Sequence, residues 1–294
     1  MMLDEKHRAI HQSKAVYVSR KEWFANPGVF ITNTMGGANR ASRDVVAALS
    51  RDKTFASFRD YVPQSVPGGV LAPDSVVMLK RLCGRRVEAA TLAFGPAFLE
   101  KRYIALQMRD FGKNKQLGEL AAQVAAIARR EQPCDVVLFR AGAAYGHDTL
   151  RSLRDFKELL SEADPMVTVQ VFQDINIWSI AALIANAELV ISTSLHVRIV
   201  AFAYAVPRMY NTAFKGTRKY EYFVNNWDNS SPGFAWQLKR PLVSFARDWN
   251  RLKNESMKAY RDTTRSAEVA DKYESTSFNV WSKLLSGEKS EVGG

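Results

Sequence analysis

The sequence predicts an α/β protein of two lobes, each with a parallel β-sheet. Short runs of β-branched and aliphatic residues alternate with longer segments whose apolar residues recur at helical spacing, which is the pattern of βαβ units. The chain has 294 residues, which is long for one core because an average domain has roughly 150 residues. Its composition, 47% hydrophobic and 24% charged, is that of an ordinary globular protein.

The second lobe, residues 96–235, shows the alternation most clearly. Strands are predicted at residues 103–108, 135–139, 167–172, 189–192 and 206–210. Helices are predicted at residues 116–130, 149–163, 178–187 and 195–205. The first two helices each place their apolar residues on one face, so each is expected to cover a face of the sheet. We therefore predict a doubly wound sheet in this lobe.

The first lobe, residues 1–95, has a weaker pattern and is predicted to hold a smaller sheet. Its strands are expected at residues 15–18, 29–32, 54–58 and 69–72, with a helix at 42–49. Residues 83–101 contain Gly84 and Gly95-Pro96 and are expected to form a hinge between the lobes. Residues 236–294 are predicted to be a helical extension whose end, from residue 286, is disordered.

The cysteine content and the apolar segments argue against disulfides, a metal site and a membrane span. The only cysteines, Cys83 and Cys134, form no CxxC motif and no zinc-ligand spacing, so we expect a reducing compartment, no disulfide framework and no metal. Residues 1–12 lack the apolar core of a signal peptide, and no apolar run is long enough to span a bilayer. The expected location is the cytoplasm, including its membrane face through peripheral contact.

The net charge favours an anionic partner. Lysine and arginine number 41 and aspartate and glutamate 30, which gives +11. The basic pairs are scattered and not interleaved with aromatic residues, so we read most of them as solvated faces and predict no nucleic-acid partner. These pairs are Lys80-Arg81, Arg85-Arg86, Arg129-Arg130 and Arg218-Lys219.

The strongest candidate for chemistry lies where the strand at residues 189–192 meets the next helix. The segment Ser192-Thr193-Ser194-Leu195-His196 puts three hydroxyls at a helix start and a histidine in its first turn. Hydroxyls and unbonded amides at such a place bind anions, and an imidazole can deliver a proton near neutral pH. A second interpretation remains open, in which the hydroxyls are ordinary N-caps and the histidine is a packed, hydrogen-bonded residue.

Two arginines also follow predicted strands. Arg59 follows residues 54–58 and Arg109 follows residues 103–108. The guanidinium fork matches a carboxylate or a phosphate, which makes both arginines candidates for binding an anion. The alternative is an ion pair with the adjacent aspartate, Asp60 or Asp110. Asp148, just before the helix expected at residues 149–163, is interpreted as its N-cap.

The chain resembles the polysaccharide pyruvyl transferase family in three segments. The main segment is Leu189-Val190-Ile191-Ser192-Thr193-Ser194-Leu195-His196, followed by Ala201, Pro207 and Lys215. Phe58-Arg59-Asp60 is similar to a valine-arginine-aspartate element of the family, and Ala72-Pro73-Asp74 to its proline-aspartate element. The resemblance spans about residues 54–220.

This resemblance implies a fold of glycosyltransferase-B type, with two Rossmann-like lobes facing a cleft. It implies phosphoenolpyruvate as donor, a glycan or lipid-linked oligosaccharide as acceptor, and a pyruvate ketal as product, without a separate cofactor. Such a reaction belongs to the biosynthesis of an exopolysaccharide or another cell-surface glycan. The first lobe is expected to be truncated, because the family's asparagine, glycine-aspartate and glycine-triplet elements are not found before residue 50.

The resemblance also assigns residues. It makes His196 the catalytic residue. Some family members have an arginine where this chain has Ser194, and Arg198 or Arg109 is expected to replace that charge. The donor-binding residues it implies are Arg59, Arg109, Ser192, Ser194, Leu195, Arg198 and Lys215.

Two other functions remain open from the sequence. One is a nucleotide-sugar-dependent glycosyltransferase of the same architecture, since fold does not determine chemistry. The other is a non-catalytic remnant or a glycan-binding protein, which the weak pattern of the first lobe favours.

Overall fold

The computed structural model describes residues 31–35, 55–60, 69–109, 116–131, 134–142, 148–211, 218–228, 235–236 and 263–286. The chain forms two compact units. Unit 1 comprises Met1–Ser75, Arg218–Trp227 and Glu268–Gly294, and unit 2 comprises Val76–Thr217 and Asp228–Ala267. The predicted lobe boundaries at residues 95 and 235 stay a prediction.

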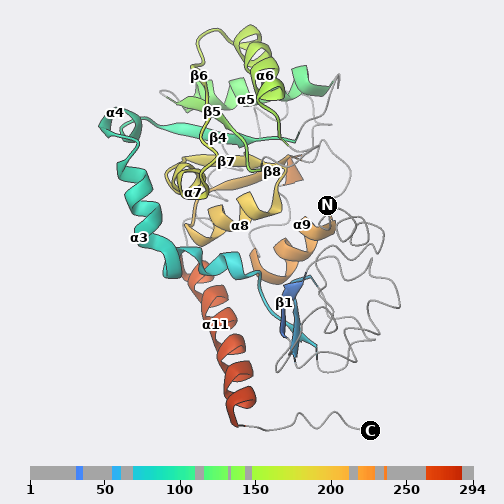
Figure 1. The fold of residues 1–294 in the computed structure, drawn as a ribbon. Coiled ribbons are helices and arrows are strands. Elements are labelled where there is room, and N and C mark those ends of the chain that lie inside the picture. The colour runs from blue at the N-terminus through green and yellow to red at the C-terminus, as the bar shows by residue number, and fades with distance from the viewer. Residues whose placement is uncertain are drawn as a thin grey trace, which may run out of the picture. The chain divides into compact units, whose positions relative to one another are not determined.

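Unit 2 contains a six-stranded parallel sheet (Figure 1). Its strands are β4 (Tyr103–Gln107), β5 (Asp135–Phe139), β6 (Val169–Val171), β7 (Leu189–Ser192), β8 (Arg208–Asn211) and β9 (Ala235–Trp236). The order across the sheet is β6-β5-β4-β7-β8-β9, with every pair parallel. The chain winds outward from β4 to β6, returns to lie beside β4, and winds the other way, as in a doubly wound sheet. The strand order therefore reverses between β4 and β7.

Helices cover both faces of this sheet. They are α5 (Gln116–Arg130), α6 (Leu150–Ala163), α7 (Ile177–Ala185) and α8 (Leu195–Ala203). Side chains of β4 alternate between two cores: Ile104 and Leu106 pack with α5 and α6, whereas Tyr103 and Ala105 pack with α7 and α8. Because a parallel sheet is buried on both faces, its strands are continuously apolar, which is why the sequence predicted them well. The predicted bounds of β5, β7 and α5 match the structure.

The expected hinge over residues 83–101 is instead largely helical. Helix α3 (Leu79–Leu92) runs through Gly84 after a 3-10 turn at Ser75–Met78, and α4 (Pro96–Leu99) follows. One glycine costs a helix only about 1 kcal/mol, and the leucine, arginine and alanine residues around Gly84 favour helix. Gly95 does mark a turn, because its φ of +76° lies in the left-handed region.

Unit 1 contains a smaller parallel sheet, formed by β1 (Ile31–Met35), β2 (Phe55–Phe58) and β3 (Val70–Leu71) in that order. These strands overlap the predictions at residues 29–32, 54–58 and 69–72. The predicted strand at residues 15–18 and helix at 42–49 lie outside the described residues, as does the tail after residue 286. The last helix, α11 (Thr263–Ser286), lies in the extension predicted to be helical.

Two residues of the π-helical turn Val224–Asp228, which follows helix α9 (Arg218–Phe223), bond to the segment after β2 in unit 1. Trp227 Nε1 donates to the Arg59 carbonyl at 2.9 Å, and Asn226 Nδ2 donates to the Asp60 carbonyl at 2.7 Å. Lys272 of α11 lies over the Trp227 ring at 5.5 Å.

The mixed α/β structure, with a parallel sheet in each of the two units, confirms the predicted fold class. No helix in the described ranges has the length and apolar character needed to cross a bilayer.

Candidate active site at the carboxyl edge of the unit 2 sheet

The reversal between β4 and β7 marks the candidate site. In doubly wound sheets, ligands bind beyond the carboxyl ends of the strands at the point of reversal, because the loops diverge there. Gln107 and Ser192 end the two strands and are direct neighbours in the sheet register. Arg109 follows the first strand, and His196 follows the second in the first turn of α8. Four residues chosen from sequence, Arg109, Ser192, Ser194 and His196, therefore follow or end these two strands.

Gln107 organises the turn between β7 and α8. Its side chain is buried, and its Oε1 accepts from the Ser192 hydroxyl at 2.9 Å. The same oxygen accepts from the amides of Thr193 at 3.1 Å and Ser194 at 3.0 Å. Ser192 Oγ in turn accepts from the Ser194 amide at 2.8 Å. The hydroxyl of Ser192 and two of the turn amides are thus engaged inside the protein, where they fix the start of α8.

Asp148 connects this turn to the loop after β5. Its Oδ2 accepts from Gln107 Nε2 and from the Ala141 amide, both at 2.8 Å. The N-cap of α6 is Thr149, whose Oγ1 accepts from the Ser152 amide at 3.1 Å. The interpretation of Asp148 as that N-cap was therefore wrong. The carboxylate instead joins the segments that follow β4, β5 and β7.

His196 faces solvent at the start of a helix that is otherwise buried there. Leu195, Val197 and Arg198 are all buried, whereas His196 is exposed. Which of the two interpretations of His196 holds stays a prediction. Ser194 is the N-cap residue but makes no side-chain cap hydrogen bond. The first amides of a helix have no intrahelical acceptor and carry partial positive charge, so the start of α8 favours an anion.

Arg109 presents its charge beside the same turn. Its backbone N–H donates to Thr193 Oγ1 at 3.2 Å, which places the residue against the β7–α8 turn. Its side chain is exposed. In the part of the chain that the structure describes, no carboxylate forms an ion pair with this guanidinium, and Asp110 lies outside that part. Arg109 can therefore offer a guanidinium fork to a carboxylate or phosphate.

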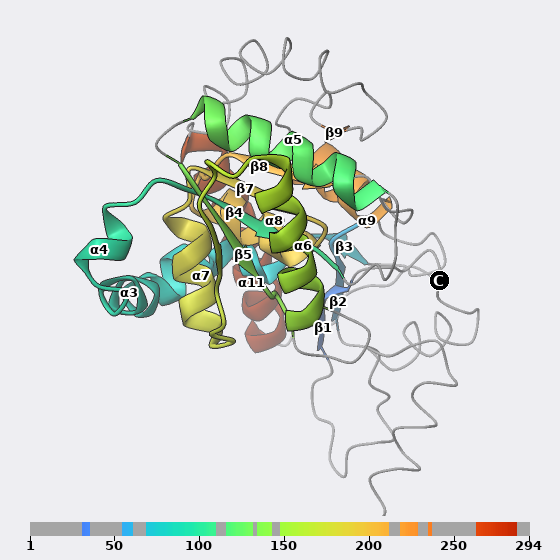
Figure 2. The same cartoon turned by 90° about the horizontal axis from the view of Figure 1, so that it is seen from above.

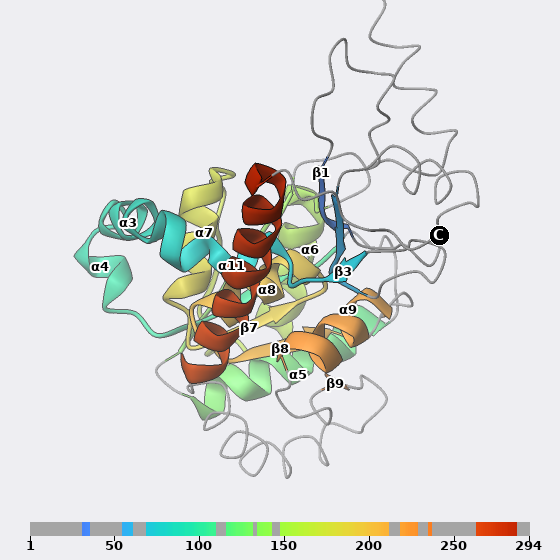
Figure 3. The same ribbon diagram turned by 90° about the horizontal axis from the view of Figure 1, so that it is seen from below.

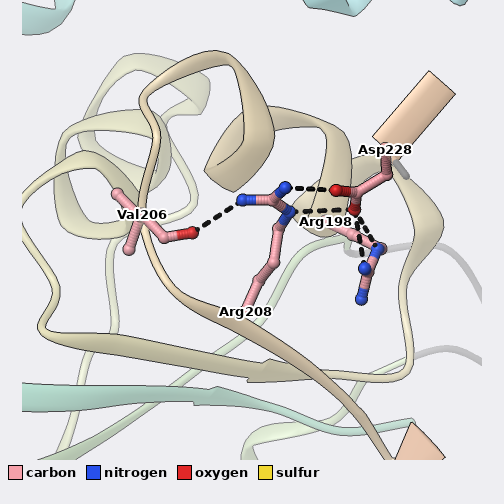
Figure 4. A network of polar contacts seen from close by, with 4 residues as sticks. All are labelled: Arg198, Val206, Arg208 and Asp228. Atoms are coloured by element: carbon pink, nitrogen blue, oxygen red, sulfur yellow. Dashed lines mark hydrogen bonds and ion pairs between the residues drawn. The ribbon is translucent and has the colours of Figure 1, made fainter. Parts of the chain in front are cut away.

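Arg198 points inward, into a buried ion-pair network (Figure 4). Its Nη2 and Nε lie 2.6 Å and 2.8 Å from Asp228 Oδ2. Arg208 binds the same carboxylate, through Nε at 3.0 Å and through Nη2, and donates from Nη1 to the Val206 carbonyl at 3.0 Å. The network ties α8 to β8 through Asp228, within unit 2. Donor binding by Arg198 stays a prediction.

Arg59, in unit 1, is paired with carboxylates. Its Nη1 contacts Asp74 Oδ2, and its Nε lies 3.5 Å from Asp60 Oδ1. Both aspartates are buried, and the arginine side chain is 16% exposed. The arginine-aspartate and proline-aspartate segments, 15 residues apart, therefore meet in the folded unit. Its predicted donor role stays a prediction, as does that of Lys215, which lies outside the described residues.

A comparison of the chain with models of protein families shows which family it belongs to. The family model described as polysaccharide pyruvyl transferase matches residues 38–209, more than half of the chain. The chain belongs to the polysaccharide pyruvyl transferase family. In this family member, the matched range contains β4, β7, Arg109 and the Ser192–His196 segment. No curated protein sequence matches the chain.

Solved structures that are similar to this pyruvyl transferase family member share little sequence with it. A Neisseria meningitidis UDP-GlcNAc 2-epimerase bound to UDP-GlcNAc is 10% identical over 72% of this chain and 55% of its own, with a TM-score of 0.42. A Rickettsia africae glycosyltransferase is 12% identical over 74% and 57%, with a TM-score of 0.43. Anabaena HepE in complex with UDP and glucose is 10% identical over 86% and 72%, with a TM-score of 0.47. The chain thus spans little more than half the length of the first two.

Sequence reasoning missed two residues that shape this edge. The sequence does mark Gln107, because it is a polar residue at the end of the otherwise apolar strand Tyr103–Gln107. Nothing in the sequence marks Asp228, because it lies far along the chain from the two arginines that it binds, in a segment without periodicity. In the described ranges, no three His, Cys, Asp or Glu side chains gather as a metal site would require, and the metal-free site stays a prediction.

Proposed function

We propose that this chain transfers a pyruvyl group from phosphoenolpyruvate to a sugar of a surface polysaccharide or its precursor, forming a pyruvate ketal. The observation that carries the proposal is the exposed His196 at the start of α8, beside the reversal between β4 and β7. It lies inside the range that matches the pyruvyl transferase family. An exposed imidazole beside an anion-favouring helix start suits a reaction whose donor carries a carboxylate and a phosphate.

His196 acts as the general acid in this proposal. It donates a proton to the methylene carbon of the donor, which becomes a methyl group, and the neighbouring carbon becomes cationic. One sugar hydroxyl attacks that carbon and loses its proton. A second hydroxyl of the same sugar then replaces phosphate at this carbon and also loses its proton. One released proton returns to His196 and the other leaves with phosphate, so no oxidant or reductant is needed.

The donor's negative charges are held by two groups at this edge. The amides of the first turn of α8, at Leu195 and the two residues after it, face the anion with the positive end of the helix dipole. The guanidinium of Arg109 binds a second anionic group in bidentate fashion. Ser194 contributes as the N-cap residue, while Ser192 acts through the shape of the turn because its hydroxyl bonds to Gln107. Preorganised groups of this kind stabilise charge that develops during the reaction.

The proposal also includes an acceptor, a location and the absence of a cofactor. The acceptor is a glycan or a lipid-linked oligosaccharide, and the product belongs to an exopolysaccharide or another cell-surface glycan. The reaction takes place in the cytoplasm, at the inner face of the membrane where a lipid-linked acceptor is presented. No cofactor takes part beyond phosphoenolpyruvate itself, which is consumed as a substrate.

Donor binding is tested without knowledge of the acceptor. Thermal unfolding of the full chain is measured with phosphoenolpyruvate and, separately, with UDP. We expect phosphoenolpyruvate to raise Tm, since a ligand that binds only the folded state stabilises it. A rise with UDP alone would contradict the proposal and favour a nucleotide-sugar-dependent glycosyltransferase. No rise with either ligand would favour a non-catalytic glycan-binding protein.

Turnover is then tested with His196→Ala. Phosphate release is measured with phosphoenolpyruvate and a panel of surface-glycan oligosaccharides. Because a positioned general acid contributes about 10²- to 10⁴-fold, we expect the variant to lose at least about two orders of magnitude in kcat. Its Tm should be unchanged, because the side chain is exposed. Equal phosphate release by the variant and the unchanged chain would remove His196 from the mechanism.

A further inference from the structure

The outer face of α3 combines exposed leucines with arginines. Leu82 is 74% exposed and Leu92 is 70% exposed. Arg85, Arg86 and Ala89 lie between them and are also exposed. Spacings of three, four, seven and ten residues from Leu82 place all five on one side of the helix. These five residues form what we name the α3 face.

Helix α7 packs beside α3 and contacts one residue of this face. Helices α3 and α7 lie side by side (Figures 2 and 3) and pack through Val87, Ala181 and Ala182. The Arg86 guanidinium lies over the Trp178 ring, 5.3 Å from its centroid, near the start of α7. Two more large apolar residues at that start are exposed: Ile175 is 56% and Ile177 is 68% exposed. Arg86 of the α3 face therefore lies beside the start of α7, where Ile175 and Ile177 are exposed.

The position of these two isoleucines relates them to the candidate active site. Ile175 and Ile177 follow β6, so they lie on the carboxyl edge of the same sheet from which Arg109 and His196 project. All of these residues belong to unit 2. A surface that contacts the two isoleucines is therefore on the side of the sheet where the chemistry is proposed.

We propose that the α3 face and the start of α7 dock on an anionic lipid bilayer. Exposed leucine and isoleucine side chains enter the boundary between headgroups and acyl chains, while arginines bind lipid phosphates, as in amphipathic helices that lie in the membrane interface. Glu88 is the only acidic residue of this helix. Each basic residue near an anionic surface contributes about 1 kcal/mol of attraction.

Charge favours a bilayer over a second copy of the chain. A symmetric pair of α3 faces would bring Arg85 and Arg86 of one copy toward those of the other, and the whole chain already carries +11. Like charges in an interface are destabilising. An anionic bilayer instead neutralises these arginines and buries the leucines in the same event. Docking does not depend on the proposed reaction, since it involves neither donor nor acceptor.

Vesicle sedimentation of the full chain tests the docking. The chain is mixed with vesicles of phosphatidylglycerol and phosphatidylcholine, or of phosphatidylcholine alone, and the sedimented fraction is measured. We expect binding to the anionic vesicles that weakens with added salt, because salt screens exposed charges. The double variant Arg85→Gln, Arg86→Gln should bind at least roughly tenfold more weakly. Leu82→Gln with Leu92→Gln should also weaken binding, while leaving Tm unchanged.

A matched control separates a local surface from overall charge. Arg151 and Arg154 are exposed on α6, and Arg151→Gln with Arg154→Gln removes the same charge. This control should sediment like the unchanged chain. An equal loss in the control would overturn the proposal, as would sedimentation with neither vesicle. Dimerisation that the leucine variant abolishes, measured by analytical ultracentrifugation, would assign the face to a second copy. Because no donor or acceptor is present, failure of the proposed reaction leaves these outcomes unaffected.

Discussion

Arg59 and Arg109 occupy corresponding places in the two units but have different environments. Each follows a strand of a parallel sheet, β2 or β4, and each precedes an aspartate. The Arg59 guanidinium is bound by two buried carboxylates of its own unit. The Arg109 side chain is exposed, and no described carboxylate pairs with it. A strand-end position thus makes an arginine a candidate ligand, but the presence of carboxylates decides whether its charge is already used within the fold.

The difference divides the arginines of this protein into two groups. Arg198 and Arg208 belong with Arg59, because buried Asp228 binds both of them. A buried carboxylate that loses its cation keeps the cost of desolvation without the compensating attraction. Removing a paired arginine should therefore lower stability, whereas removing Arg109 should lower ligand affinity and leave stability unchanged.

The largest expected effect is on the stability of unit 1. Arg59→Ala removes a cation from the buried carboxylates of Asp74 and Asp60. Breaking a buried pair in this way costs about 3–5 kcal/mol. We expect the free energy of unfolding to fall toward that amount, measured by urea denaturation followed by circular dichroism. Arg59→Lys should restore part of the loss, since it keeps the charge but not the fork.

Arg109→Ala is the control for this prediction. It removes a residue of the same type from the end of a strand, without removing the partner of a buried carboxylate. Its denaturation midpoint should match that of the unchanged chain. If Arg59→Ala were equally stable, the ion pairs of Arg59 would contribute little, and the contrast between the two strand ends would not hold.

The next largest effect concerns Gln107. Gln107→Leu keeps the volume of the side chain but removes the acceptor of the Thr193 and Ser194 amides. Leaving such groups without their partner costs about 1–3 kcal/mol. Because the turn then holds α8 less precisely, kcat should fall by about tenfold or more, while KM for phosphoenolpyruvate changes less. Steady-state phosphate release measures both constants.

Gln123→Leu provides the matched control. Gln123 is a fully buried glutamine in the middle of α5, away from the carboxyl edge. Its substitution can change Tm, but it should leave kcat near that of the unchanged chain. A similar fall in kcat for both variants would show that Gln107 acts through general stability and not by positioning the turn.

A smaller effect is expected at Arg109. Arg109→Gln removes an exposed charge that the proposal assigns to an anionic group of the donor. One charge-assisted contact is worth about 1.5–3 kcal/mol, so KM for phosphoenolpyruvate should rise by about tenfold or more, with Tm unchanged. Arg151→Gln, an exposed arginine of α6, should leave KM unchanged. Equal KM values for Arg109→Gln and the unchanged chain would show that Arg109 does not bind the donor, so that only the start of α8 would bind the donor's anionic groups.

Sequence periodicity predicted the unit 2 sheet well and its polar contacts poorly, for a physical reason. Buried parallel strands such as β5 and β7 are continuous apolar runs, so the sequence itself marks their bounds. The partners of Gln107, Asp148 and Arg198 lie between 7 and 87 residues away, and only the folded arrangement of loops brings them together. Helix α3 is not apparent from the sequence, because Gly84 and Gly95 both resemble linker signals, whereas only Gly95 has positive φ.

The smallest expected effect concerns the two cysteines of unit 2, which differ in accessibility. Burial raises the pKa of the Cys134 thiol to about 11, whereas Cys83 on α3 is half-buried. Since the thiolate is the reactive form, Cys134 stays protonated and unreactive at a pH well below 11, and its reactivity rises only as pH approaches that value. We expect iodoacetamide to label Cys83 first in the native chain, as followed by peptide mass spectrometry. In denaturant both thiols should react at similar rates, and equal rates in the native chain would contradict the burial of Cys134. Selective labelling would also place a fluorescent probe beside the α3 face, where its emission should change on binding anionic vesicles.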